Sequence, residues 1–162
     1  MNYKERLDRL HENKDRESII DSLITKINKH AWVPIKDIEF AKHLIKIRTT
    51  DAMLKHELFN NLSTDKTSTS LFSQQRTDPT IPIVMVNISF LSQKKGNPVS
   101  QTGAGGKSVD KIVDLIKQKT RLDSVPGFSL RSNKVEEGNH RVEALKQLGY
   151  KSCPVVIWDG WD

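Results

Sequence analysis

The chain has 162 residues, a formal net charge of +6 and a hydrophobic content of 36%. This length suits one ordinary domain with an extension and is too short for two full-sized domains. The sequence contains neither a run of about 18 apolar residues nor a signal-peptide core, so we expect a soluble, cytoplasmic protein without a membrane partner. Its single cysteine, Cys153, excludes an intramolecular disulfide and a cysteine-based zinc site.

Helical periodicity dominates the first 75 residues. Apolar residues recur three and four positions apart over residues 3–30, and the segment 32–35, which contains Pro34, interrupts this pattern. Further helices are expected over residues 38–47 and 54–62. Residues 63–73 are rich in serine and threonine and are interpreted as a linker or loop. Residues 1–75 therefore form a helical N-terminal region that could dock a partner protein.

Residues 76–162 are predicted to form a second domain in which strands and helices alternate. This order is typical of the α/β (α+β) class. The expected elements are a strand over 81–91, a mobile loop over 92–107, a helix capped by Ser108, short strands over 128–131 and 134–136, a helix from Asn139 to Gly149, and a closing strand over 155–158.

Basic residues are concentrated in the second half of the chain. Residues 92–134 contain nine cations against three anions, which favours a polyanionic partner such as a nucleotide or a nucleic acid, although a solvated surface gives the same count. The cations are Lys94, Lys95, Lys107, Lys111, Lys117, Lys119, Arg121, Arg131 and Lys134.

The first of two glycine motifs spans residues 103–108, and its Gly-Lys-Ser ending resembles the end of a Walker A loop. A complete Walker A motif has a glycine at the position of Gln101 and directly follows a strand. This segment meets neither condition. We interpret the segment as a flexible basic lid, in which Lys107 would close over phosphate groups.

The second motif, Glu137-Gly-Asn-His-Arg141, places a glycine between a predicted strand and a predicted helix. The free N–H groups and the positive dipole end of such a helix favour an anion. The predicted phosphate contacts are Gly138, Asn139, His140 and Arg141. His140 could also exchange a proton near neutral pH, and Glu136 or Glu137 could hold Mg²⁺ or a water molecule, or else pair with Arg141 or Lys134.

The order G-N-H-R-x-x-A-L-x-x-L-G-x-x-x-x-P-V-x-I, from Gly138 to Ile157, resembles the ParB/sulfiredoxin superfamily. Members of that superfamily share a (D/E)-G-x-(H/R)-R box, a helix, a glycine and a proline-led strand. The resemblance covers residues 134–158, extends more weakly back to residue 81, and is absent from residues 1–75. It implies a small mixed sheet with helices, and phosphate groups held at the glycine box.

This chain departs from two branches of the superfamily. Sulfiredoxins have a catalytic cysteine where this chain has Asn139, which argues against sulfinic-acid reduction. In the free-serine kinase branch an acid before the glycine assists phosphoryl transfer, and Glu137 matches it, but that branch's second acid has no counterpart between residues 79 and 109.

Three functions are compatible with the sequence. The first is binding of a nucleoside triphosphate (ATP or CTP) with Mg²⁺, followed by hydrolysis or phosphoryl transfer with Glu137 and His140 as catalytic residues. The second is a DNA-acting ParB-like nuclease or a DNA-binding protein, whose basic segment 92–134 follows the DNA backbone. The third is a non-enzymatic interaction module with a degenerate nucleotide site.

Overall fold

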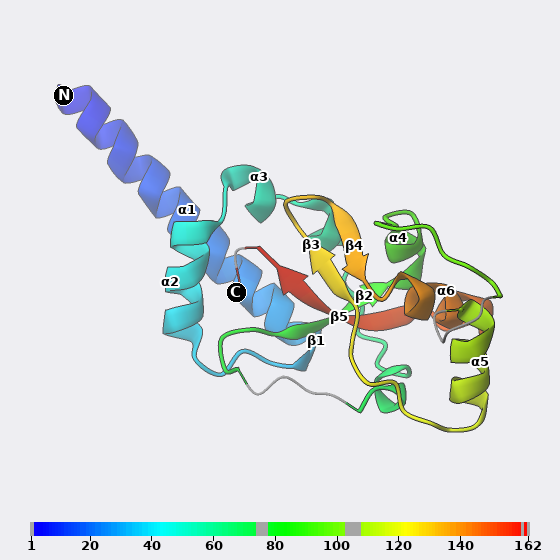
Figure 1. The fold of residues 1–162 in the computed structure, drawn as a ribbon. Coiled ribbons are helices and arrows are strands. Elements are labelled where there is room, and N and C mark those ends of the chain that lie inside the picture. Colours follow the sequence, from blue (N-terminus) through cyan, green and yellow to red (C-terminus); the bar gives the residue numbers. More distant parts are fainter. Residues whose placement is uncertain (1, 74–77, 103–107, 160, 162) are drawn as a thin grey trace.

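The computed structural model describes residues 2–73, 78–102, 108–159 and 161. These ranges contain six α-helices and a five-stranded sheet of order β1-β2-β5-β3-β4, which confirms the α/β (α+β) class (Figure 1). The elements are α1 (Tyr3–Lys29), β1 (Ala31–Val33), α2 (Ile38–Arg48), α3 (Asp51–Leu54), the 3-10 helices η1 (Glu57–Asn60) and η2 (Thr69–Leu71), β2 (Ile83–Asn87), α4 (Ile88–Ser92), α5 (Val109–Lys117), β3 (Gly127–Ser129), β4 (Lys134–Glu137), α6 (Asn139–Gln147) and β5 (Ser152–Trp158).

The sheet is mixed. Strand β3 pairs with β5 in parallel, whereas β1 with β2, β2 with β5, and β3 with β4 are antiparallel. Helices α1, α2 and α3 lie at one end of the molecule, and α5 and α6 lie at the other (Figure 1). In the described part of the chain, no helix is both long enough and apolar enough to cross a membrane.

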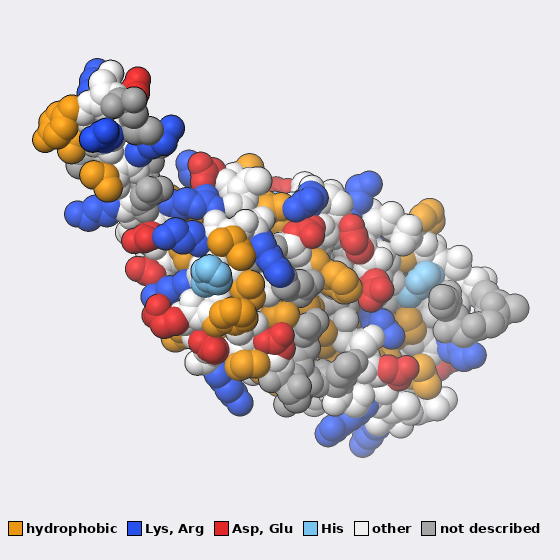
Figure 2. Space-filling model, turned by 60° about the vertical axis from the view of Figure 1, so that its left-hand side comes forward, with side chains coloured by type: hydrophobic (Ala, Val, Ile, Leu, Met, Phe, Trp, Pro, Cys, Tyr) orange, Lys and Arg blue, Asp and Glu red, His pale blue; other side chains and the backbone are white. Residues whose placement is uncertain are grey.

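Helix α1 confirms the helix expected over residues 3–30. Its first turn is closed by a capping box, in which the Asn2 side chain accepts from the Glu5 N–H and the Glu5 carboxylate accepts from the Asn2 N–H. The N-terminal half projects from the body of the molecule (Figures 1 and 2), and residues 2–10 are all exposed. Only from Ile20 onward does the apolar stripe of the helix enter the core, with Ile24 and Ile27 following at helical spacing.

Strand β1 is an element that the sequence did not predict. It occupies residues 31–33 and pairs with β2, with Ala31 opposite Val84 and Val33 opposite Ile83. Pro34 follows it immediately, so the proline ends an edge strand, where its missing N–H removes no ladder hydrogen bond. The segment predicted as an N-terminal helical region therefore contributes a strand to the sheet.

Residues 63–73, interpreted as a linker or loop, form a loop that packs against the sheet. The Ser63 N–H donates to the Met85 carbonyl at 2.8 Å, and the fully buried Ser68 hydroxyl donates to the Ser152 carbonyl at 2.8 Å. The serine and threonine hydroxyls thus satisfy backbone groups of the sheet, and residues 63–73 are an irregular part of the packed structure. The helix predicted over residues 54–62 is replaced by α3 and the short 3-10 helix η1.

The strand predicted over residues 81–91 was too long. Strand β2 ends at Asn87, and the apolar run continues as helix α4, whose Ile88, Phe90 and Leu91 are buried. A short apolar run suits a buried strand and a buried helix equally, so periodicity could not locate this change.

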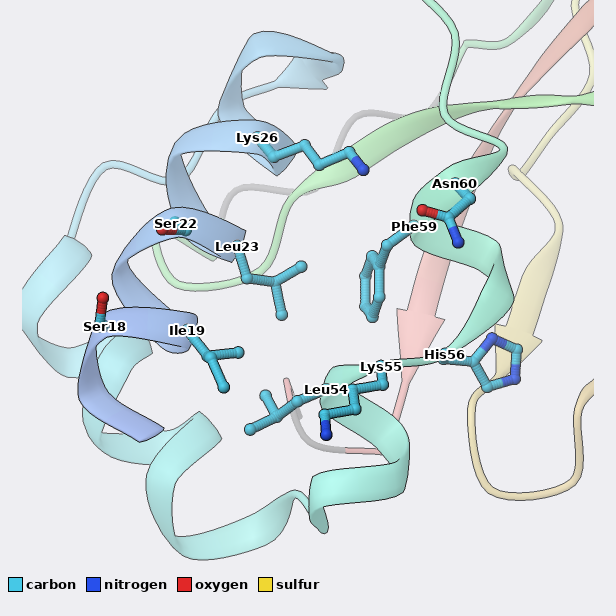
Figure 3. Close-up of a pocket in the computed structure, with 10 residues that line it drawn as sticks. All are labelled: Ser18, Ile19, Ser22, Leu23, Lys26, Leu54, Lys55, His56, Phe59 and Asn60. Carbon is cyan, nitrogen blue, oxygen red and sulfur yellow. The ribbon is translucent and has the colours of Figure 1, made fainter. Parts of the chain in front are cut away.

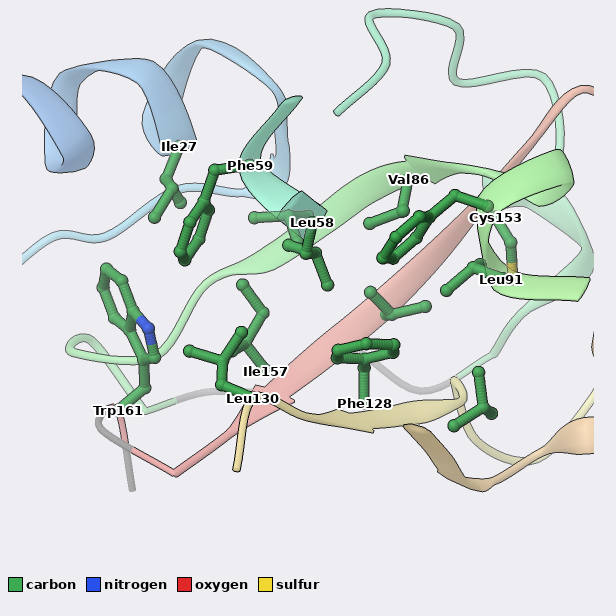
Figure 4. Packing of buried hydrophobic residues seen from close by; sticks show 14 of the residues in the cluster. Ile27, Leu58, Phe59, Val86, Leu91, Phe128, Leu130, Cys153, Ile157 and Trp161 are labelled. Atoms are coloured by element: carbon green, nitrogen blue, oxygen red, sulfur yellow. The ribbon is translucent and has the colours of Figure 1, made fainter. Parts of the chain in front are cut away.

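The central strands β2 and β5 bury both of their faces. Val84 and Val86 of β2, with Val155 of β5, join one large cluster that extends from Ile27 of α1 to Leu145 of α6. Figure 4 shows part of this cluster, including Ile27 and Val86. Ile81, Ile83 and Val156 form a smaller cluster. The core consequently takes residues from both sides of residue 75.

Candidate functional site

The turn between β4 and α6 consists of one residue, Gly138. Its backbone φ is +87°, a left-handed conformation that non-glycine residues rarely adopt. An added Cβ would also lie 2.8 Å from the Pro126 side chain. The Gly138 carbonyl accepts the first helical hydrogen bond, from the Val142 N–H at 3.0 Å. The predicted strand, glycine and helix order is thereby confirmed.

The first turn of α6 presents unpaired donors. Within the described ranges, the N–H groups of Asn139, His140 and Arg141 have no acceptor. The half-buried Arg141 side chain likewise makes no hydrogen bond or ion pair with any described residue. Because the N-terminal end of a helix carries a partial positive charge, these groups together can attract an oxyanion.

The Asn139 side chain is used differently from the prediction. It is buried, its Nδ2 donates to the Val135 carbonyl at 2.9 Å, and its Oδ1 accepts from the Gly96 N–H at 3.2 Å. Both ends of this amide are therefore occupied by backbone groups, and the side chain holds residue 96 against the end of β4. The backbone N–H of Asn139 remains available to bind an anion.

The His140 ring also contacts the loop between α4 and α5. Its Nε2 accepts from the Ser100 N–H at 3.2 Å, so this nitrogen carries no proton in the arrangement seen. The same loop is fixed to α5, because the Ser100 carbonyl accepts from the Val109 N–H at 2.9 Å. His140 thus lies next to the loop instead of facing open solvent.

A group of polar side chains that the sequence did not single out joins this loop to α6. Gln101 and Gln147 exchange hydrogen bonds of 2.7 and 3.0 Å, and Gln101 also donates to Asp110 at 2.6 Å. Glu143 forms an ion pair of 3.3 Å with Lys95. Residues 139, 143 and 147 are four positions apart, and residues at this spacing lie on one face of a helix. This spacing was the sequence signal that could have indicated a shared polar face.

Electrostatics favour the ionised form of Glu143. Partial burial opposes ionisation, but the hydrogen bond from Gln147 and the charge of Lys95 outweigh it and lower the pKa of Glu143 below its ordinary value. The ion pair is therefore retained at neutral pH and is lost in acid.

The two predicted Mg²⁺ ligands are both exposed. Glu136 accepts from the Ser132 hydroxyl at 2.8 Å, and the Glu137 carboxylate has no hydrogen-bond partner among the described residues. The described residues include no group of three or more histidine, cysteine, aspartate or glutamate side chains that could hold a metal ion. Lys107 and the glycines at 103, 105 and 106 lie outside the described residues, whereas the N-cap predicted for Ser108 is confirmed by its bond from the Lys111 N–H.

The basic segment 92–134 is less available to a polyanion than its composition suggests. Lys94 pairs with Glu57 at 2.5 Å, and Lys95 pairs with Glu143. Two of the cations therefore connect elements within the protein. Sequence composition cannot detect this, because Glu57 and Lys94 are far apart along the chain.

Cys153 is fully buried in β5, as the sequence predicted for a core residue. Burial raises the pKa of its thiol far above the usual range, and the charge of Arg141 opposes this only in part. A thiolate nucleophile at this position is thus disfavoured.

Comparisons with protein-family models, with curated proteins and with solved structures found no match for this chain. The resemblance of the glycine box to the ParB/sulfiredoxin superfamily therefore stays a prediction from the sequence.

Proposed function

We propose that this protein binds a nucleotide through its phosphate groups at the turn formed by residues 138–141. The observation that carries the proposal is the set of donors at the start of α6: three consecutive N–H groups and the Arg141 guanidinium, none with a partner among the described residues. Backbone amides and a guanidinium are the donors that phosphate oxygens prefer. The ParB/sulfiredoxin resemblance assigns the same residues to phosphate and supports the proposal independently.

Mg²⁺ would accompany the phosphates in this proposal. Magnesium commonly takes one or two carboxylates from the protein and further oxygens from substrate phosphates. Glu136 and Glu137, both exposed at the end of β4, fit that limited role. The metal would neutralise phosphate charge, and Glu137, next to Gly138, would orient an attacking water or hydroxyl group for hydrolysis or phosphoryl transfer.

In this proposal, the role of His140 depends on whether its contact with Ser100 is broken. While its Nε2 accepts from Ser100, it cannot receive a proton from a substrate. We propose that nucleotide binding displaces the Ser100 N–H from His140 Nε2 and so frees the imidazole. Arg141 then contributes directly to binding, and His140 contributes through proton transfer. A cytoplasmic location is part of the same proposal, since nucleotides are abundant there.

The test is a thermal-shift titration with ATP, CTP and GTP, each with Mg²⁺. At least one nucleotide should raise the melting temperature, because a ligand that binds only the folded state stabilises it. Arg141→Ala should weaken that nucleotide about tenfold or more, since a charge-assisted hydrogen bond contributes roughly 1.5–3 kcal/mol. His140→Ala should weaken it less.

The matched control is Lys146→Ala, which removes an exposed cation from the opposite end of the same helix. It should bind nucleotide like the unmodified chain. If Arg141→Ala and Lys146→Ala behave alike, or if no nucleotide raises the melting temperature, the proposed site is wrong. A nucleic acid bound with steep salt dependence in the absence of nucleotide binding would favour the DNA-acting alternative instead.

A further inference from the structure

A groove of ≈ 440 Å³ lies between α1 and the segment formed by α3 and η1, at the end of the molecule away from α6. Its apolar side chains, Ile19, Leu23, Leu54 and Phe59, point toward one another (Figure 3). Ile19 leaves 38% of its surface exposed, whereas Leu23, Leu54 and Phe59 are buried. The groove therefore has a buried apolar floor, from which the Ile19 side chain is exposed to solvent.

Lys26 and Lys55 flank this floor (Figure 3). Both are exposed, and neither forms an ion pair with a described residue. The residues lining the groove include no aspartate or glutamate. The charge around the apolar floor is consequently positive and uncompensated.

The acidic residues nearest to the groove in sequence are already paired with other cations. Asp21 pairs with Lys42, Asp51 with Arg16, and Glu57 with Lys94. Glu17, one residue before the groove begins, pairs with Lys46 of α2. Because these carboxylates are paired elsewhere, they do not neutralise Lys26 and Lys55, which can pair with a partner.

We propose that this groove docks an acidic amphipathic helix of a partner protein. Apolar side chains on one face of that helix would cover Ile19 and its neighbours, and carboxylates on both sides of the face would pair with Lys26 and Lys55. The groove follows α1 from residue 18 to residue 26, about 12 Å or roughly two helical turns, which matches anchors at positions i, i+4 and i+7.

The projecting arm of a second copy is a poorer occupant. Tyr3, Leu7 and Leu10 are exposed on this arm, but residues 2–16 carry five Lys/Arg and four Asp/Glu, so the net charge of the arm is about +1. The arm therefore offers no excess of carboxylates to pair with Lys26 and Lys55. Charge complementarity therefore selects an acidic partner over the arm.

The experiment measures fluorescence anisotropy of labelled peptides titrated with the full chain. The main probe is a peptide of about 14 residues, roughly four helical turns, with leucines at i, i+4 and i+7 and glutamates on both sides of them. A second probe replaces the glutamates with lysines, and a third has the sequence of residues 2–16 of this chain. The acidic probe should bind, and the other two should bind at least about tenfold more weakly.

Two pairs of variants locate the binding site. Lys26→Glu combined with Lys55→Glu should weaken the acidic probe about tenfold or more, whereas Lys4→Glu combined with Lys36→Glu, with the same change in net charge outside the groove, should not. Ile19→Ser should weaken the probe, and Ile47→Ser, an exposed aliphatic residue of α2 outside the groove, should not. All four positions changed in the groove and control lysine pairs are exposed, so these variants should fold.

The proposal is overturned if the acidic probe fails to bind at about 1 mM, if the lysine probe or the arm peptide binds as tightly, or if groove and control variants behave alike. Arg141→Ala should bind the acidic probe like the unmodified chain. This last result separates the groove from the nucleotide site, so that either proposal can fail without the other.

Discussion

Gly138 and Gly149 bound helix α6, and both have a positive φ, +87° and +85°. Their surroundings differ. A Cβ at Gly138 would lie within 2.9 Å of three Pro126 atoms, whereas a Cβ at Gly149 would meet nothing within 4 Å. The two positions therefore separate the cost of the left-handed conformation from the cost of a steric clash.

Alanine at each glycine should measure these two costs. Gly149→Ala should lower the free energy of unfolding by about 1–2 kcal/mol, the usual cost of a left-handed alanine. Gly138→Ala should lower it by about 1–3 kcal/mol more, because Pro126 or the helix must move. Urea denaturation of both variants gives the comparison. Equal losses would show that the contact between Gly138 and Pro126 does not constrain the turn.

The 3-10 helix η1 is capped by a histidine. His56 Nδ1 accepts from the Leu58 N–H at 3.0 Å, and the ring packs edge-on against Phe128, with ring centroids 5.6 Å apart. Burial, assisted by the charge of Lys94 and opposed by that of Glu57, lowers the pKa of His56 below its ordinary value of 6.5. The folded protein therefore disfavours the protonated ring, which could no longer accept at Nδ1.

This cap should make stability depend on pH. As the pH falls through 6.5, the unfolded chain protonates His56 before the folded chain does, so the free energy of unfolding decreases between pH 7 and pH 5. His56→Asn keeps a capping acceptor without the titration and should lose less stability over that interval. His56→Ala should be about 1 kcal/mol less stable at pH 7. Thermal denaturation of the three proteins at both pH values checks this, and parallel losses in the unmodified chain and in His56→Asn would contradict it.

At the scale of the whole molecule, the first 75 residues and the remainder share one apolar core. Ile27 of α1 and Leu145 of α6 are both fully buried in the same cluster. Either residue changed to alanine should therefore lower the free energy of unfolding by about 2–5 kcal/mol and shift a single transition. Far-ultraviolet circular dichroism and tryptophan fluorescence should give coincident curves. Two separate transitions, each sensitive to only one variant, would show that the segments unfold independently.

The sequence predicted those elements that have local signals. Helices α1, α5 and α6 combine apolar periodicity with recognisable ends, such as the Ser108 cap and the left-handed Gly149. Strand β1 was missed because three residues are too few for a pattern, and the role of residues 63–73 depends on hydrogen bonds to strands far away in sequence. Those contacts are decided by tertiary packing, which residue composition does not record.

The candidate site likewise combines features with local sequence signals and contacts that depend on tertiary packing. The Gly138 turn and the unpaired amides of α6 result from local backbone rules, and the sequence located them. The contacts of Asn139 with Gly96 and of His140 with Ser100 join segments about 40 residues apart, as the separations of 43 and 40 positions show. Sequence reasoning therefore located the turn between strand and helix but could not tell which side chains form hydrogen bonds within the protein.

The most direct test of the central claim is a nuclear magnetic resonance titration of the ¹⁵N-labelled chain with a nucleoside triphosphate and Mg²⁺. If the start of α6 holds the phosphates, the amide resonances of Asn139, His140 and Arg141 should shift most, because their N–H groups acquire acceptors, and Ser100 should shift as its N–H leaves His140 Nε2. A saturating titration that leaves these four amides unchanged would contradict the account.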